Sequence, residues 1–178
     1  GGDQGINVTD TVYAFENVSE FVNGTGMSGA PISFGQIYHL ATADTLTSVT
    51  FGLAQDNYYT TSQIGVAVYE VASDGVTLSR QLFSTQLERK AEGGLRTVTF
   101  PARLLQPGNY FIEIQQLGTN NIGMSYQQAS EAVCYQDVDG VLQAVSGAYL
   151  VIRANFGHGA KAYKHNVTVT DITRPTKT

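Results

Sequence analysis

Side chains that could bind a sugar gather at two places in the sequence. A tyrosine ring can stack on the apolar face of a pyranose, while neighbouring amide and carboxylate oxygens take its hydroxyl groups. We predict a ligand-binding surface from such residues, and the alternative is that the rings cover the edge of a sheet or an adjacent domain. The predicted binding residues are Asp56, Asn57, Tyr58, Tyr59, Tyr126 and Gln127. Tyr135, followed by Gln136 and Asp137, stands in a similar neighbourhood.

Asp137 and Asp139 could bind a metal ion, because they stand two residues apart just before Gly140. Calcium takes about six to eight oxygen ligands, often from loops. The sequence lacks the full spacing of a calcium-binding loop, and Asp-Gly is also ordinary turn chemistry. Ca²⁺ at Asp137 and Asp139 is the one candidate cofactor. The favoured interpretation of these residues is an ordinary turn without a metal ion.

Carboxylates on or near predicted strands allow a glycosidase hypothesis. Glu113 could act with Glu70 or Glu131, but such a mechanism needs two carboxyl groups at a set separation. Glu113 is expected to face out of its strand, so solvated surface acids are the favoured interpretation. A β-sandwich glycoside hydrolase is the least favoured function.

A cysteine and histidine dyad could be drawn from Cys134 and His39. Cys134 lies in a strand-like run, and free cysteine is among the most buried residue types, so we predict an inert buried thiol. His39 alternates in phase with Ile37, which predicts a half-buried histidine with a hydrogen-bond partner. The chain also lacks the motifs of serine hydrolases, phosphate-binding loops and zinc proteases. We predict that the protein is not an enzyme.

Composition narrows the range of partners. The chain has 178 residues, 10 Lys and Arg against 15 Asp and Glu, and a formal net charge of -5. Nucleic acid is not an expected partner, because its binding depends on basic side chains that release counterions. No apolar run approaches the ~18 residues that span a bilayer, so membrane insertion is not expected. The single cysteine leaves core packing, rather than an internal disulfide, to hold the fold.

The elements that must position these residues are β-strands. Apolar residues alternate with polar ones, and turn dipeptides such as Asp74-Gly75, Pro107-Gly108 and Asp139-Gly140 separate the runs. Pro101 is expected to end one strand. This spacing predicts an all-β protein, an antiparallel β-sandwich of jelly-roll type. The expected strands are 46–53, 64–71, 79–88, 95–100, 109–116, 122–127, 132–136, 141–145 and 148–156.

The chain is predicted to hold one domain between two linkers. Residues 1–5 form an opening linker, and residues 6–157 form the sandwich. Residues 158–178 add a C-terminal strand and a linker that leads to a further domain. Weaker β patterns cover 7–15 and 166–172, while the Gly- and Asn-rich stretch 16–31 is expected to be a long surface loop.

Several runs have a familiar order: Gly35 to Leu40, Ala43 to Thr50, Val66 to Tyr69, Leu105 to Ile112, and Leu150 to Arg153. In this order of elements, residues 30–157 resemble the jelly-roll accessory modules of large secreted or surface proteins of the Bacteroidetes type. That group includes adhesin-like domains. The resemblance implies an extracellular β-sandwich used for binding or spacing, and it assigns no ligand.

We therefore predict a non-catalytic binding or adhesion module that is secreted or displayed on the cell surface. Its partner would be a glycan or a surface protein, besides neighbouring domains of the same chain. Carbohydrate binding is the sharper form of this hypothesis. The alternative is a structural spacer or protein-docking domain within a multidomain surface protein.

Overall fold

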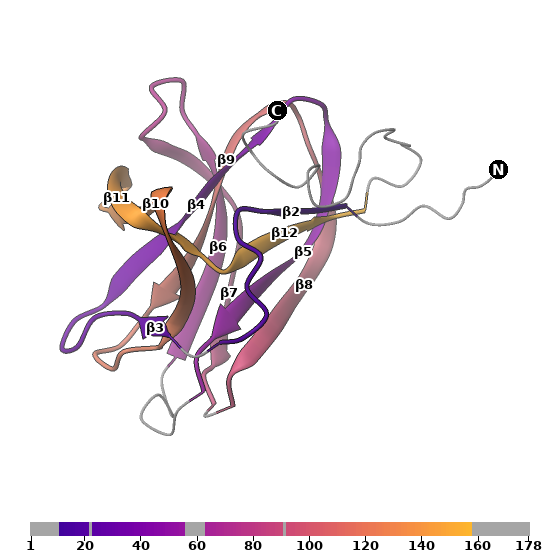
Figure 1. The fold of residues 1–178 in the computed structure, drawn as a ribbon. Coiled ribbons are helices and arrows are strands. Elements are labelled where there is room, and N and C mark those ends of the chain that lie inside the picture. Colours follow the sequence, from indigo (N-terminus) through magenta and orange to yellow (C-terminus); the bar gives the residue numbers. More distant parts are fainter. Residues whose placement is uncertain (1–10, 22, 56–62, 91, 158–178) are drawn as a thin grey trace.

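The computed structural model describes residues 11–21, 23–55, 63–90 and 92–157. Every regular element among them is a β-strand, and they contain no helix that could cross a membrane. The strands form two packed layers (Figure 1). The predicted strand at 166–172 lies outside the described residues.

The first layer contains four strands in the order β2 (Thr11–Ala14), β12 (Ile152–Phe156), β5 (Asp44–Leu53) and β8 (Gly94–Leu105). All neighbours are antiparallel. The first described strand, β2, therefore pairs with the last one, β12, which lies between β2 and β5.

The second layer has the order β4 (Ile32–Leu40), β9 (Gly108–Gln116), β6 (Gln63–Val71) and β7 (Leu78–Glu88). Its neighbours are also antiparallel. Only β6 and β7 are joined as a hairpin within one layer, while the other connections among these eight strands cross between layers. Numbered one to eight along the chain, the strands give orders 1-8-3-6 and 2-7-4-5, which is the pairing of a jelly roll. The predicted fold class is confirmed.

A long hairpin is inserted between β9 and β12. It consists of β10 (Met124–Val138) and β11 (Val141–Leu150). The start of β10 pairs with β3 (Gly24–Thr25) and with the end of β5, and its later part pairs with β4. The strand thus passes from the first layer to the second and links the eleven described strands into one network.

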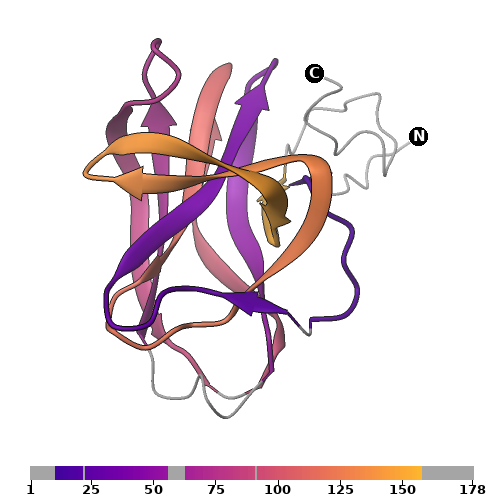
Figure 2. The same cartoon turned by 60° about the vertical axis from the view of Figure 1, so that its left-hand side comes forward.

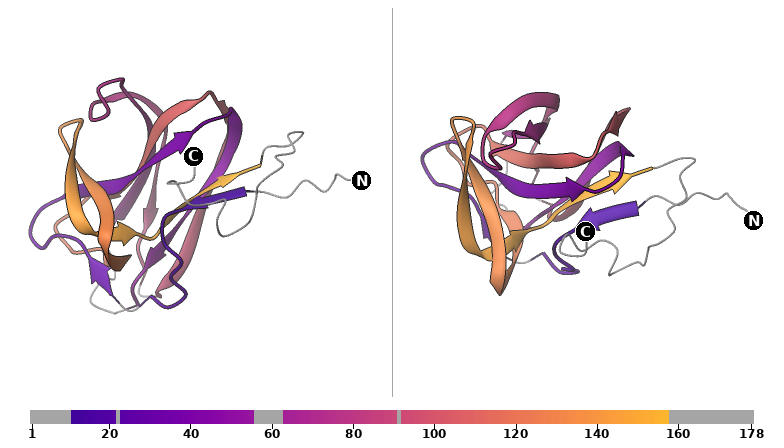
Figure 3. Two further views of the ribbon diagram at one scale, coloured as in Figure 1. Left: turned by 45° about the horizontal axis from the view of Figure 1, so that its top comes forward. Right: turned by 90° about the horizontal axis from the view of Figure 1, so that it is seen from above.

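The hairpin lies across the outer face of the second layer (Figure 2). Its tip is fastened to the β6–β7 turn by two backbone hydrogen bonds. Leu78 N donates to Gly140 O at 2.9 Å, and Leu142 N donates to Val76 O at 2.7 Å. Figure 3 shows the hairpin at one side of the sandwich, with β2 and β12 running towards the other. The hairpin therefore covers a sheet face that the alternation pattern alone would leave to solvent.

The core lies between the two layers and follows the predicted alternation. Val49, Phe51 and Leu53 of β5 are fully buried, and Ile112 and Ile114 of β9 are at most 1% exposed. Inside the core, the Tyr38 hydroxyl donates to the Ile152 carbonyl at 2.7 Å and so ties the layers together. Burial of alternate apolar side chains is the main source of stability in such a fold.

Four expectations about strands are wrong. The segment 148–156, predicted as one strand, is divided between the end of β11, which pairs with β10, and β12, which pairs with β5. Strand β8 continues through Pro101 to Leu105, because Pro101 sits at a bulge of an edge strand, where its missing N–H is not needed. The segments 122–127 and 132–136 are parts of the single strand β10, which a bulge interrupts between Gln128 and Val133. The stretch 16–31 contains the short strand β3.

Candidate functional site

The candidate site is a pocket of about 280 Å³ between β4 and the β10–β11 hairpin, which we call the Tyr126 pocket. It opens at the edge of the second layer, where β10 leaves β5 to join β4. Its volume lies just below the ~300–1,000 Å³ that is usual for small-molecule sites. The lining residues are Thr25, Gly26, Ile32, Phe34, Tyr126, Cys134, Tyr135, Gln136, Val145, Ala148 and Leu150.

The bulge in β10 shapes this pocket. Gln128 pairs with Ala148 and Val133 pairs with Ser146, so residues 129–132 have no matching length of β11 opposite them. Bulges of this kind bend a strand and increase its twist. Tyr126 and Cys134, on either side of the bulge, consequently line the same hollow.

The described lining of the pocket is uncharged. Among the residues that the structure describes, it contains no Asp, Glu, His, Lys or Arg, and its one thiol belongs to Cys134. Burial raises the pKa of the Cys134 thiol, so this group stays protonated and unreactive at neutral pH. Burial and the neighbouring Cys134 also raise the pKa of Tyr135. The site is therefore electrically neutral and suits a neutral ligand.

Hydrogen-bonding groups are few, and they lie among apolar neighbours. Thr25 and Gln136 contribute a hydroxyl and an amide, and Tyr126 adds an aromatic ring with a hydroxyl group. Tyr126 is half-buried and packs against the main core, which limits the movement of its ring. This combination provides a surface for stacking with a small number of polar contacts.

The structure brings one of the predicted binding residues into this pocket and separates another from it. Tyr126 lines the hollow, but the next residue in β10 points to the opposite face. Gln127 instead holds the segment after β2: its Nε2 donates to Asn17 Oδ1 at 2.9 Å, and Asn17 N donates to its Oε1 at 3.3 Å. Asp56, Asn57, Tyr58 and Tyr59 lie outside the described residues.

Tyr135 and Gln136 are the site residues that the prediction left out. Their composition was a usable signal, because an aromatic residue followed by an amide also marks Tyr126 and Gln127. Pairing of Tyr135 with Gly35 and of Gln136 with Phe34 attaches this part of β10 to β4. That long-range contact, which local alternation does not show, places both residues at the pocket.

The aspartates predicted to bind calcium form a tight turn. Asp137 Oδ1 accepts a hydrogen bond from Gly140 N at 2.8 Å, and Asp139 has a φ of 53°. Among the described residues, no three His, Cys, Asp or Glu side chains gather at one point. The turn chemistry accounts for both residues, and calcium here stays a prediction.

Glu113 is not a solvated surface acid, so that expectation is wrong. It faces outward from β9 as predicted, but the hairpin covers it and leaves it 1% exposed. Gln115 Nε2 donates to its Oε2 at 2.6 Å, while its Oε1 has no N–H or O–H donor among the described residues. Burial first, and then the nearby Asp137 carboxyl, raise the pKa of Glu113 to about 8. Because this pKa lies above neutral pH, Glu113 is mostly protonated at pH 7.

None of the acids in the glycosidase hypothesis lines the Tyr126 pocket. Glu70 is paired with Arg80 at 3.0 Å, and Glu131 is exposed in the β10 bulge. Neither Glu113 nor Asp137 lines the Tyr126 pocket.

His39 has the expected partner but is exposed rather than half-buried. Its Nδ1 lies 2.8 Å from Asn109 Oδ1. Cys134 is buried, as predicted, at 6% exposure. The two residues do not form a dyad, since His39 is outside the lining of the Tyr126 pocket.

Known proteins add little to this description. No family model and no curated protein matches the sequence. A solved structure, a selenomethionine-labelled mutant of chitosan-binding module 1 derived from chitosanase/glucanase from Paenibacillus sp. IK-5, aligns over 85% of this chain and 96% of that one. The identity is 15% and the TM-score is 0.32, a similarity too low to transfer a ligand or a site.

Proposed function

We propose that this chain is a non-catalytic binding module that receives a neutral sugar ring in the Tyr126 pocket. The observation that carries the proposal is the uncharged described lining, which combines the Tyr126 ring with Thr25 and Gln136. Sugars are neutral and amphipathic, so they gain from ring stacking and from a few hydrogen bonds without needing a charged partner.

The absence of an acid–base pair from the lining supports a binding role over catalysis. General acid–base catalysis needs a titratable group within hydrogen-bond reach of the substrate. The one thiol in the pocket has a raised pKa and is a poor nucleophile. A small pocket at the edge of a rigid sandwich can hold a single sugar unit, such as the end of a glycan chain.

We place this activity outside the cell, on a secreted or surface-displayed protein. Low charge content and the single cysteine are compatible with that setting. The glycan would belong to a neighbouring surface or to a polymer, and flanking domains would supply any further activity.

Binding can be tested by calorimetric titration of the protein with a panel of neutral mono- and disaccharides. Gln136→Ala should weaken binding of the sugar that the parent recognises by roughly tenfold, because a hydrogen bond to the ligand is lost. Tyr126→Leu should weaken it further, since the stacking ring is removed while apolar bulk remains.

Gln143→Ala is the matched control. Gln143 pairs with Gln136 across the hairpin, is exposed and does not line the pocket. The control should bind as the parent does. The proposal fails if no neutral sugar binds at millimolar concentration, or if the Gln136 and Gln143 variants behave alike.

Protein docking is the second candidate, and it rests on strand β11. This strand pairs with β10 alone apart from one bridge to Thr77, and it carries no charged residue. Val141 and Val145 are 44% and 45% exposed. Uncharged edge strands with exposed apolar side chains can pair with another chain. Sedimentation that shows concentration-dependent association in the parent, but not in Val141→Lys, would favour this function, because Val141 does not line the Tyr126 pocket.

A further inference from the structure

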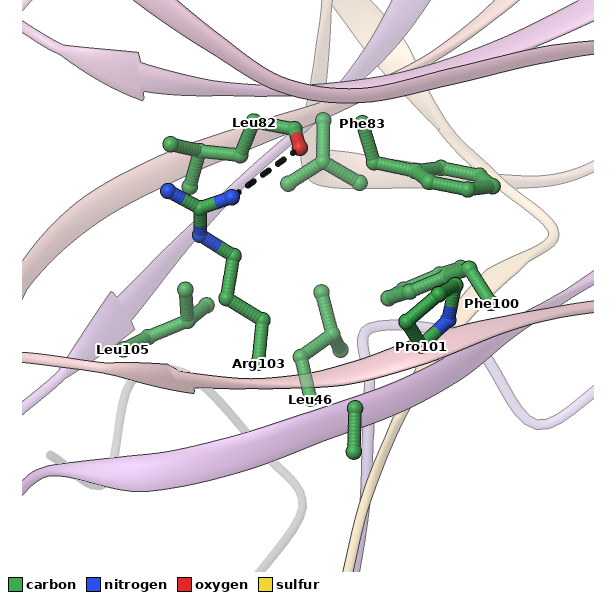
Figure 4. A pocket seen from close by; sticks show the side chains of 9 residues that line it. Leu46, Leu82, Phe83, Phe100, Pro101, Arg103 and Leu105 are labelled. Carbon is green, nitrogen blue, oxygen red and sulfur yellow. Dashed lines mark hydrogen bonds between the residues drawn. The ribbon is translucent and has the colours of Figure 1, made fainter.

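A second hollow, on the other side of the sandwich, has a different chemistry. It lies between β7 and β8, and we call it the Arg103 crevice (Figure 4). Its volume is about 230 Å³. The lining residues are Leu46, Val68, Leu82, Phe83, Phe100, Pro101, Ala102, Arg103 and Leu105.

The topology explains why this side of the sandwich is open. Strand β7 ends the second layer and pairs with β6, while β8 ends the first layer and pairs with β5. No backbone ladder joins the two edges. Strand β8 also bulges here: Leu46 pairs with Arg103 and Ser48 with Thr99, so β8 has two extra residues. The bulge, which contains Pro101, bends β8 locally.

The inner wall of the crevice is apolar. The Phe83 and Phe100 rings, from opposite layers, lie with their centroids 4.0 Å apart. Leu46 and Val68 belong to the buried core, so an occupant would contact the core directly. A hydrocarbon cavity of about 150 Å³ is enough to bind benzene, and this crevice is larger.

Arg103 is the one charged residue among the described residues of the lining. Its guanidinium reaches across the mouth towards β7, as Figure 4 shows, where Nη1 lies 3.5 Å from the Leu82 carbonyl. A hydrogen bond of that length is weak. Arg103 is exposed, and no carboxylate among the described residues is recorded in an ion pair with it. Most of its five donors are therefore available to an anion.

We propose that the Arg103 crevice is a second ligand site, which takes a small apolar carboxylate. The hydrocarbon part would lie among the leucine and phenylalanine side chains, and the carboxylate would meet the Arg103 fork in bidentate geometry. This ligand class differs from the neutral ligand of the Tyr126 pocket, and the two sites share no lining residue.

Octanoate is a suitable probe, with octanol as its uncharged counterpart. Binding is measured by NMR titration of the methyl groups that line the crevice. The parent should bind octanoate at least about tenfold more tightly than octanol, because only octanoate forms a charge-assisted hydrogen bond. Arg103→Gln should remove that preference while octanol binding persists.

Two variants complete the test. Arg96→Gln is the matched control, because Arg96 is also on β8, contacts a β7 carbonyl at 3.5 Å and does not line the crevice. It should bind octanoate as the parent does. Leu82→Trp adds bulk to a side chain that lines the crevice and should abolish binding of both probes.

The proposal is overturned if octanoate and octanol bind equally to the parent, or if neither perturbs the methyl groups of the crevice. An equal loss of octanoate binding in the Arg96 and Arg103 variants would also overturn it, since that result reflects net charge alone. Thermal melting of each variant checks that the fold is intact. Failure here leaves the sugar-binding test untouched, because the Tyr126 pocket is probed by separate ligands and variants.

Discussion

Arg89 is the largest side chain that is fully buried in the described part of the chain. It acts as a donor to backbone carbonyls at the end of the sandwich where three connections meet. Its Nε donates to Ile122 O at 2.8 Å, and its other nitrogens donate to the carbonyls of Ala54, Lys90 and Glu92. Arg89 therefore satisfies acceptors that would otherwise be buried without partners.

Replacement of Arg89 by methionine should lower the free energy of unfolding by about 2–4 kcal/mol, since several buried carbonyls lose their donor. Chemical denaturation measures this change. Arg96→Met is the control and should change stability by no more than about 0.5 kcal/mol, because Arg96 makes one long contact. A methionine variant at position 89 as stable as the parent would contradict this role for the arginine.

Glu113 should make stability depend on pH. Its folded-state pKa of about 8 exceeds the ordinary value of 4.5, so the folded protein holds a proton that the unfolded chain has released. This contribution is fully present below the unfolded pKa and is lost as pH rises to the folded pKa. Between about pH 5 and 8 the free energy of unfolding should fall by up to about 1.4 kcal/mol per pH unit.

Denaturation across this pH range should show a flatter profile for Glu113→Gln than for the parent. Glutamine keeps the shape of the side chain and does not titrate. Glu131→Gln, at an exposed acid of the same hairpin region, should keep the parent profile. Identical profiles for the parent and Glu113→Gln would show that this carboxyl group is not the source of the pH dependence.

At the scale of elements, the β10–β11 hairpin is the feature that creates both the Tyr126 pocket and the burial of Glu113. Its turn depends on Gly140, whose φ of 86° follows the positive φ of Asp139. Two such residues in succession are typical of the tight turns that suit the twist of a hairpin. Asp137 adds a side-chain contact to the Gly140 N–H.

Gly140→Ala should destabilise the protein by roughly 1 kcal/mol, because a Cβ is strained at positive φ. Amide exchange should speed up at Leu78 and Leu142, whose N–H groups fasten the tip. Gly118→Ala is the control: it has open space for a Cβ and no positive φ, so both measurements should match the parent. Unchanged exchange at the tip in Gly140→Ala would show that the turn does not hold the hairpin in place.

The whole molecule is held together by pairing of segments far apart in the chain. Thr11 pairs with Phe156, and β5 pairs with β12 about a hundred residues later. The chain loses the entropy of closing such long loops before the contacts between the paired strands can stabilise it. Of the described strand pairs, only β6–β7 and β10–β11 join strands that follow one another in the chain.

Refolding should therefore be slow for a protein of this size, on the order of milliseconds to seconds. Stopped-flow dilution from denaturant measures the rate. Interrupted unfolding, which refolds molecules before their prolines isomerise, separates out any slower phase that arises from the four prolines. Refolding in microseconds would contradict this account of the topology.

Local sequence patterns are enough to predict the class of structure and much of the core. Alternation along β5 and β9 predicts both the strands and their inward faces, because a period of two is a local property of extended backbone. Asp139-Gly140 likewise predicts its turn, since positive φ is a property of those residues. Burial of Cys134 follows from its apolar neighbours.

The position of the candidate site depends on pairing between distant segments of the chain. Glu113 faces outward by alternation, yet the hairpin that covers it comes from a segment more than twenty residues later in the chain. Tyr126 and Gln127 are adjacent and similar in composition, but alternation sends one into the pocket and the other to Asn17. The pocket exists because β10 crosses from one layer to the other and bulges on the way. Such pairing depends on the free energy of the whole fold, and a local sequence pattern does not predict it.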